Sequence, residues 1–189
     1  MVIDPLQQQT VGEFILENEG NLGIAVEVAR AFPPIQRQIV QRAMDALEKQ
    51  LQSSLGKEWE IGNDREQVLL VGYSAVYFRR KSWGEVYISL ENRRKEEDTI
   101  VGVWRDRQRP KMAALDALLT AAFAKMRGKA SRYWAWYQEL PAEYGNWNAG
   151  PALAAMQFRQ PKIVDYWTEQ MILVHKIASP VIDKFVKGK

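Results

Sequence analysis

Residues 75–104 read AVYFRRKSWGEVYISLENRRKEEDTIVGVW, and this stretch decides the fold. Three apolar runs, at 75–79, 85–91 and 99–104, are separated by short polar segments. The middle run alternates apolar residues with polar or aromatic ones, which is the period of a strand with one buried face. Its two alternating sets are Val86, Ile88 and Leu90, and Tyr87, Ser89 and Glu91. Strands that follow one another with short connections most simply form an antiparallel meander.

Helical periodicity precedes this stretch. Apolar residues recur every four positions between 35 and 53, which predicts an amphipathic helix. A shorter helix is expected at 24–31, and it should end at Phe32-Pro33-Pro34 because proline disfavours helical backbone in the residue before it. A short apolar run at 68–71 is a further candidate strand.

Helical spacing returns after the strands, at 111–126 and again at 163–185. Pro180 lies inside the second stretch, so we expect two helical pieces there. The resulting prediction is an α+β fold, a short antiparallel meander flanked by N-terminal and C-terminal helices. We predict one domain over 1–189, with N-terminal helices at 10–53, the sheet at 66–105 and C-terminal helices at 111–186.

Aromatic residues concentrate between 133 and 147. Such a cluster forms either a small core or an interface, and we favour core for most of its members. Trp134 and Trp136 stand two residues apart, so a regular element buries both equally only if the region is largely enclosed.

The composition limits the possible chemistry. The chain has no cysteine and a single histidine, His175, so disulfides, thiolate metal sites and multi-histidine zinc sites are excluded. Neither a phosphate-binding loop nor a dinucleotide fingerprint occurs, and we expect no catalytic residue, metal or cofactor. No apolar stretch approaches the ~18 residues that span a bilayer, and no signal peptide is recognisable, so we expect a cytoplasmic protein without membrane contact.

Charge is distributed unevenly along the chain. The net charge is +3 in total, with −4 over residues 1–34 and +4 over residues 79–111. Such asymmetry favours an oriented surface that faces an acidic partner.

Basic residues cluster where the predicted strands end. In an up-down-up meander, the groups after the first and third strands share one sheet edge, and tryptophans stand beside them. Several cations next to aromatic rings could bind nucleic acid, although solvated turns are the more common role of such residues. The candidate binding residues are Arg79, Arg80, Lys81, Trp83, Trp104, Arg105, Arg107 and Arg109.

Carboxylates also surround the predicted sheet. A metal-dependent nuclease needs two or three of them on one divalent ion. Four residues could converge in this way, and nothing in their spacing decides whether they do: Asp64, Glu66, Glu85 and Glu91.

The run Trp83–Glu91, then Ile100–Val103, then Trp136, Leu140-Pro141, Tyr144 and Asn146-Trp147 resembles the C-terminal half of bacterial PD-(D/E)XK-nuclease-like proteins. The resemblance covers about residues 75–185. The nuclease signature of that family has no counterpart in this chain, so the resemblance implies an accessory part without the catalytic core, and no catalytic residue is carried over.

Three functions remain open. The first is a non-catalytic binding protein that recognises nucleic acid, or a complex that handles it, through the arginine-rich sheet edge. The second is a protein-interaction or inhibitory module, such as a mobile-element or phage factor that acts on a host complex. The third is a metal-dependent nuclease with a degenerate motif. The expected partners are nucleic acid or an acidic protein surface, and a homodimer through the C-terminal helices is possible.

Overall fold

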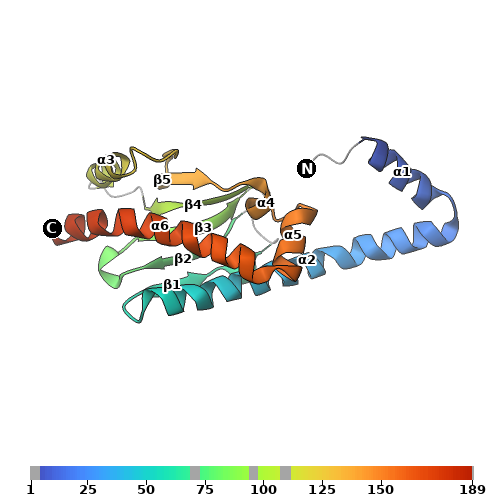
Figure 1. Ribbon diagram of the computed structural model, residues 1–189, viewed down its shortest axis with the longest axis horizontal. Helices are drawn as coiled ribbons and strands as arrows, with labels where there is room; N and C mark the ends of the chain where they lie inside the picture. Colours follow the sequence, from blue (N-terminus) through green and yellow to red (C-terminus); the bar gives the residue numbers. More distant parts are fainter. Residues whose placement is uncertain (1–4, 69–72, 94–97, 107–111, 189) are drawn as a thin grey trace.

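The computed structural model describes residues 5–68, 73–93, 98–106 and 112–188 (Figure 1). In chain order they form helices α1 (Pro5–Leu16) and α2 (Glu19–Leu55), strands β1 (Glu60–Asn63), β2 (Tyr73–Arg79), β3 (Val86–Arg93) and β4 (Asp98–Arg105), helix α3 (Met112–Ala122), strand β5 (Trp134–Glu139), and helices α4 (Ala142–Gly145), α5 (Gly150–Phe158) and α6 (Gln160–Lys187). The helices flank an antiparallel sheet, so the predicted α+β fold is confirmed.

The sheet is a meander with the spatial order β1-β2-β3-β4-β5, and every neighbouring pair is antiparallel. The three predicted strands are β2, β3 and β4. Strands β1 and β5 extend the sheet beyond the predicted range of 66–105, one on each side. Most of the run at 68–71 lies outside the described residues.

One face of the sheet is covered by helices. Figure 1 shows α6 crossing the sheet and α2 running along its β1 side. Val76, Leu90 and Val101 occupy one row across β2, β3 and β4, and all three are fully buried against the helices. They belong to the same buried core cluster as Trp167 and Met171 of α6 and Leu47 of α2. The alternation seen in the sequence therefore separates a helix-covered face from an open one.

Two predicted helix breaks are wrong. Helix α2 continues through Pro33 and Pro34, and α6 continues through Pro180. A proline inside a helix removes one hydrogen bond to the carbonyl four residues earlier. All three prolines are exposed, so water is within reach of those carbonyls and the helices are not forced to end.

The two tryptophans of β5 point to opposite faces of the sheet. Trp136 pairs with Val103 and Trp134 with Trp104, because a β-bulge shifts the register between the two pairs. Trp136 stacks on Phe123 on the helix side with ring centroids 4.1 Å apart, whereas Trp134 joins Ile100 and Tyr137 on the open face. Both tryptophans are buried, so the preference for core is confirmed here. The extra residue of the bulge escapes a simple alternation pattern.

The N-terminal part of the chain extends away from this body. Residues 5–35, which we call the arm, comprise α1 and the first half of α2, and Figure 1 shows them projecting beyond the sheet and its covering helices. None of the helices in the described part of the chain is long and apolar enough to cross a membrane.

Candidate functional site

The predicted arginine edge is largely engaged in internal contacts. Arg79 Nε donates to Glu60 Oε2 at 3.0 Å, and its Nη1 donates to the Tyr87 hydroxyl at 2.9 Å. Arg80 Nη1 donates to Asp183 Oδ2 at 2.6 Å. Trp83 is buried, and its indole N–H donates to the same Asp183 carboxylate at 2.7 Å.

Arg105 lies at the same end of the sheet, as the meander predicts, but it faces the helix side. It is buried and makes a bidentate contact with Asp116 of α3, in which Nε donates to Oδ1 at 2.7 Å. Its Nη1 also donates to the carbonyl of Arg132 at 2.6 Å. Lys81 is exposed. Arg107 and Arg109 lie outside the described residues. Nucleic-acid binding at these positions stays a prediction.

Two of the four candidate carboxylates converge. Asp64 and Glu91 line the same hollow on the open face, whereas Glu66 is exposed and pairs with Arg65 at 3.4 Å. Glu85 accepts a hydrogen bond from the Tyr87 hydroxyl at 2.9 Å outside that hollow. Across the described ranges, no group of three or more His, Cys, Asp or Glu side chains is arranged to hold a metal ion.

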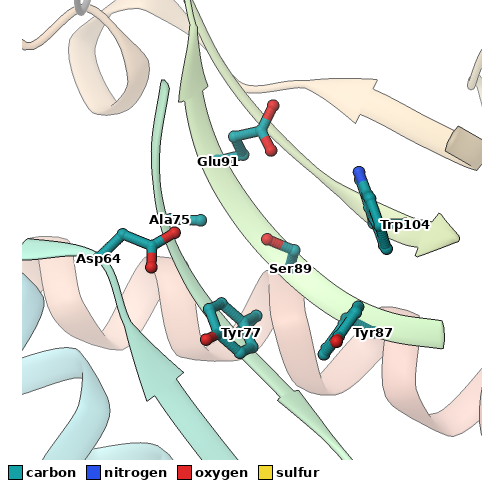
Figure 2. A pocket seen from close by; sticks show the side chains of 7 residues that line it. All are labelled: Asp64, Ala75, Tyr77, Tyr87, Ser89, Glu91 and Trp104. Carbon is teal, nitrogen blue, oxygen red and sulfur yellow. The ribbon is translucent and has the colours of Figure 1, made fainter. Parts of the chain in front are cut away.

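This hollow, which we call the sheet hollow, has a volume of about 250 Å³. Figure 2 shows its side chains in front of β2, β3 and β4, with a helix behind the strands. Small side chains at Ala75 and Ser89 leave room above the strands, and Tyr77, Tyr87 and Trp104 stand around them. The lining residues are Asp64, Ala75, Tyr77, Tyr87, Ser89, Glu91 and Trp104.

Strand register brings these side chains together. Ala75 pairs with Glu91, Tyr77 with Ser89, and Tyr87 with Trp104 across the ladder. Residues directly opposite one another in a sheet share a face, so each pair presents both of its side chains to the same hollow.

The aromatic side chains of the hollow contact one another. The ring centroids of Tyr77 and Tyr87 are 5.2 Å apart, and those of Tyr87 and Trp104 are 5.3 Å apart. The guanidinium of Arg79 lies 4.8 Å from the Tyr87 ring centroid. Tyr77 lies directly over Gly62, where an added Cβ would come within 2.3 Å of the ring. Glycine at this position therefore sets where the Tyr77 ring lies.

Burial dominates the electrostatics of the hollow. It raises the pKa of Glu91 from 4.5 to about 7, with Arg93 acting against the rise and Asp64 adding to it. Burial likewise raises the pKa of Asp64 above its ordinary value. It also raises the pKa values of the Tyr77 and Tyr87 hydroxyls. Both carboxylates are thus partly desolvated. A positive charge placed beside either of them would stabilise its charged form.

A second depression continues from the first. It has a volume of about 410 Å³ and shares Glu91 and Trp104 with the sheet hollow. Its other lining residues come from β2, β3, β5 and the segment before β5: Tyr73, Arg93, Ser131, Tyr133 and Trp134. A bound group in the sheet hollow therefore has space for an attached body that runs toward β5.

The single histidine belongs to the opposite side of the sheet. His175 on α6 has its ring centroid 4.7 Å from that of Trp59 and 5.8 Å from that of Phe78, and its Nδ1 contacts the hydroxyl of Ser179. Burial, and next the charge of Arg80, lower its pKa. These contacts are typical of a residue packed in the core.

Sequence reasoning found most of the residues of this site but did not assemble them. The alternation in β3 put Tyr87, Ser89 and Glu91 on one face, and Asp64 was among the carboxylates that could converge with Glu91, whereas Tyr77 was not joined to them. The same alternation in β2 places Tyr77 on the other face of the strand from the buried Val76 and Phe78. This pattern would have identified Tyr77 as a residue of the open face. No family model, no curated protein and no solved structure matches the chain. The resemblance to nuclease-like proteins therefore stays a prediction.

Proposed function

We propose that this chain is a binding protein that takes a small organic cation of the ammonium class in the sheet hollow. One observation carries the proposal: three aromatic rings and two carboxylates line the same open hollow. Aromatic faces attract ammonium groups through the negative face of the ring, and carboxylates supply the opposite charge.

The ring of Tyr87 already attracts one cation within the chain. The Arg79 guanidinium lies 4.8 Å from its centroid, so a ligand would meet the rest of this ring together with the rings of Tyr77 and Trp104. The volume of about 250 Å³ accommodates a trimethylammonium group, and the adjoining depression leaves room for the rest of a molecule.

Other ligand classes fit less well. A divalent metal ion prefers six or more oxygen ligands, whereas rings and two carboxylates form most of this lining. An anion would meet Asp64 and Glu91 directly. A neutral apolar molecule would leave both carboxylates desolvated without a partner, which is unfavourable.

The nucleic-acid prediction rests on the arginine-rich end of the sheet, which shares Trp104 with the sheet hollow. In the described part of the chain, Arg79, Arg80 and Arg105 each contact an internal carboxylate, which leaves less charge for phosphates. Measuring DNA and RNA binding at two salt concentrations tests that prediction separately, because phosphate contacts give a steep salt dependence.

The proposal is tested by calorimetric titration with choline, trimethyl-lysine and tetramethylammonium at pH 8. We expect binding to the wild type, and we expect Glu91→Gln to weaken it by about tenfold or more, since the variant keeps the shape and loses the charge. Trp104→Leu should weaken it by about fivefold or more, because one ring is lost. Glu66→Gln, which removes an exposed carboxylate outside the hollow, is the matched control and should bind as the wild type does.

Two outcomes would overturn the proposal. One is that none of the three ammonium compounds binds. The other is that Mg²⁺ binds in a Glu91-dependent way while the ammonium compounds do not, which would make the hollow a divalent-ion site and would favour the nuclease hypothesis.

A further inference from the structure

The second depression, which adjoins the sheet hollow, is lined by a cationic side chain. Arg93 lies two residues after Glu91 on β3, so both side chains are on the open face of the sheet, about 7 Å apart along the strand. The Arg93 side chain is 19% exposed, and its guanidinium lies 5.3 Å from the ring centroid of Tyr137. A guanidinium thus follows directly after the carboxylate that the two depressions share.

Arg93 has no hydrogen-bonded carboxylate in the described part of the chain. Its Nη2 is 3.8 Å from Glu139 Oε1, which is too long for a hydrogen bond, and that oxygen accepts one from Lys129 Nζ at 3.0 Å. The buried Nε of Arg93 has no partner among the described residues either. In contrast, Arg79 donates to a carboxylate at 3.0 Å and Arg105 donates to one at 2.7 Å. Arg93 therefore keeps donors for an anion from outside the chain.

A ligand with only a positive charge would leave this arginine unused. The charge of Arg93 already acts at the position of Glu91, because it opposes the rise in the pKa of that carboxyl. An ammonium group beside Glu91 is therefore repelled by Arg93, and a carboxylate on the same ligand would add an attraction to Arg93. Three side chains with hydroxyl groups line the second depression as well and could donate to that carboxylate: Tyr73, Ser131 and Tyr133.

We propose that the ligand of this site is a zwitterion, with a quaternary ammonium group in the sheet hollow and a carboxylate in the second depression against Arg93. This inference rests on the proposed function and names the ligand class for the same site. The class is that of ammonium carboxylates whose two charges are separated by a chain of several carbons. The separation follows from Glu91 and Arg93, which stand two residues apart on one strand.

A carboxylate suits this position better than a phosphate group does. Among the described residues that line the second depression, Arg93 is the one with a positive charge, and a guanidinium pairs with a carboxylate through two parallel N–H donors. A phosphate monoester carries about 1.5 to 2 negative charges at pH 7. Part of that charge would be left without a partner near Glu91, which lines the same depression.

Calorimetric titration at pH 8 with 4-trimethylammoniobutanoate and with its methyl ester tests the inference. The two compounds share the ammonium group and the carbon chain, and they differ in the charge of the carboxylate. We expect the wild type to bind the acid at least about tenfold more tightly than the ester. Trimethylglycine, in which a single carbon separates the nitrogen from the carboxylate, should bind no more tightly than the ester, because it is too short to span the distance from the hollow to Arg93.

Arg93→Gln removes the proposed partner of the carboxylate. We expect it to weaken binding of the acid by about tenfold and to leave binding of the ester within about twofold of the wild type, which also shows that the hollow has kept its fold. Arg93→Lys keeps the charge but loses the two-donor geometry, so it should bind the acid with intermediate affinity. Arg30→Gln is the matched control. Arg30 is exposed on the arm and pairs with Glu27 at 3.1 Å, so this variant loses the same charge away from the sheet and should bind both compounds as the wild type does.

The outcomes distinguish this inference from the proposed function. If neither the ester nor choline binds the wild type, the ammonium site is wrong and this inference is overturned with it. If both bind but the acid binds no more tightly than the ester, the ammonium site stands and the zwitterion is overturned. The role of Arg93 is overturned if Arg93→Gln keeps the preference for the acid, or if it weakens the acid and the ester equally. Equal affinity for trimethylglycine and the longer acid would overturn the separation of the charges.

Discussion

Glu91 has opposite effects on folding and on ligand binding. Its carboxyl lies on the open face between Ala75 and Ile100 in the ladder, where the neighbours offer little solvation. Arg93 and Asp64 are the charged groups that act on it, with opposite effects on its pKa. A carboxylate that is partly desolvated at this position is unfavourable for folding and favourable for binding a cation.

The pH dependence of stability should reveal this cost. The folded state holds the Glu91 proton up to a pKa of about 7, against 4.5 when unfolded, so the free energy of unfolding should fall as pH rises between these values and level off above them. Glu91→Gln should lack this decline and be more stable than the wild type at pH 8 by about 1–3 kcal/mol. Urea denaturation of both proteins at pH 5 and pH 8 measures the difference. If the free energy of unfolding changed equally between pH 5 and pH 8 in the two proteins, Glu91 would not be the cause of the pH dependence.

Gly62 is expected to control the position of Tyr77. An added methyl would come within 2.3 Å of the ring, so Gly62→Ala should displace the ring from the sheet hollow and weaken ammonium binding by about fivefold or more. Calorimetry with choline measures the effect. Gly23→Ala, where no atom lies within 4 Å of the added methyl, is the control and should bind as the wild type does. Unchanged binding in Gly62→Ala would mean that Tyr77 does not contact the ligand.

At the level of elements, α3 is tied to the sheet by a buried charge pair. Arg105 of β4 has its side chain 5% exposed, and Asp116 of α3 is its carboxylate partner. Removing the partner of a buried charge is far more destabilising than removing an exposed pair. Asp116→Ala should therefore lower the free energy of unfolding by about 3 kcal/mol or more.

The exposed pair Glu27–Arg30 provides the comparison. Glu27→Ala should change stability by less than about 0.5 kcal/mol. Replacing both partners, with Arg105→Met and Asp116→Leu, should recover most of the loss, because the buried charge of Arg105 is then removed together with its partner. Chemical denaturation of the three variants measures these values. If Glu27→Ala and Asp116→Ala lowered the free energy of unfolding by similar amounts, the Arg105–Asp116 pair would contribute no more to stability than an exposed pair does.

Strands β2, β3 and β4 could be predicted because their alternation and short connections are local properties. The long helices were misread at Pro33 and Pro180, because local rules do not show whether a carbonyl can reach water. Strand β5 was missed for another reason: its bulge hides the period of two. Local patterns thus identified the centre of the sheet better than its edges.

For the whole molecule, the sequence does not show which residues far apart along the chain come into contact. Arg80 and Trp83 look like free edge residues until the structure brings Asp183 to both of them, a hundred residues along the chain. The sheet hollow likewise needs the β2–β3–β4 register before Tyr77, Glu91 and Trp104 share one space. The arm was the opposite case, because its charge asymmetry was visible in sequence while its exposure was not.

The most direct test of the account is a comparison of choline with its neutral isostere, 3,3-dimethylbutan-1-ol, in the same calorimetric titration at pH 8. The two molecules have nearly the same shape and differ in charge. If the rings and carboxylates of the sheet hollow bind a cation, choline should bind and the alcohol should bind at least about tenfold more weakly. Equal affinity for both, or tighter binding of the alcohol, would contradict the account, since the hollow would then recognise only apolar shape.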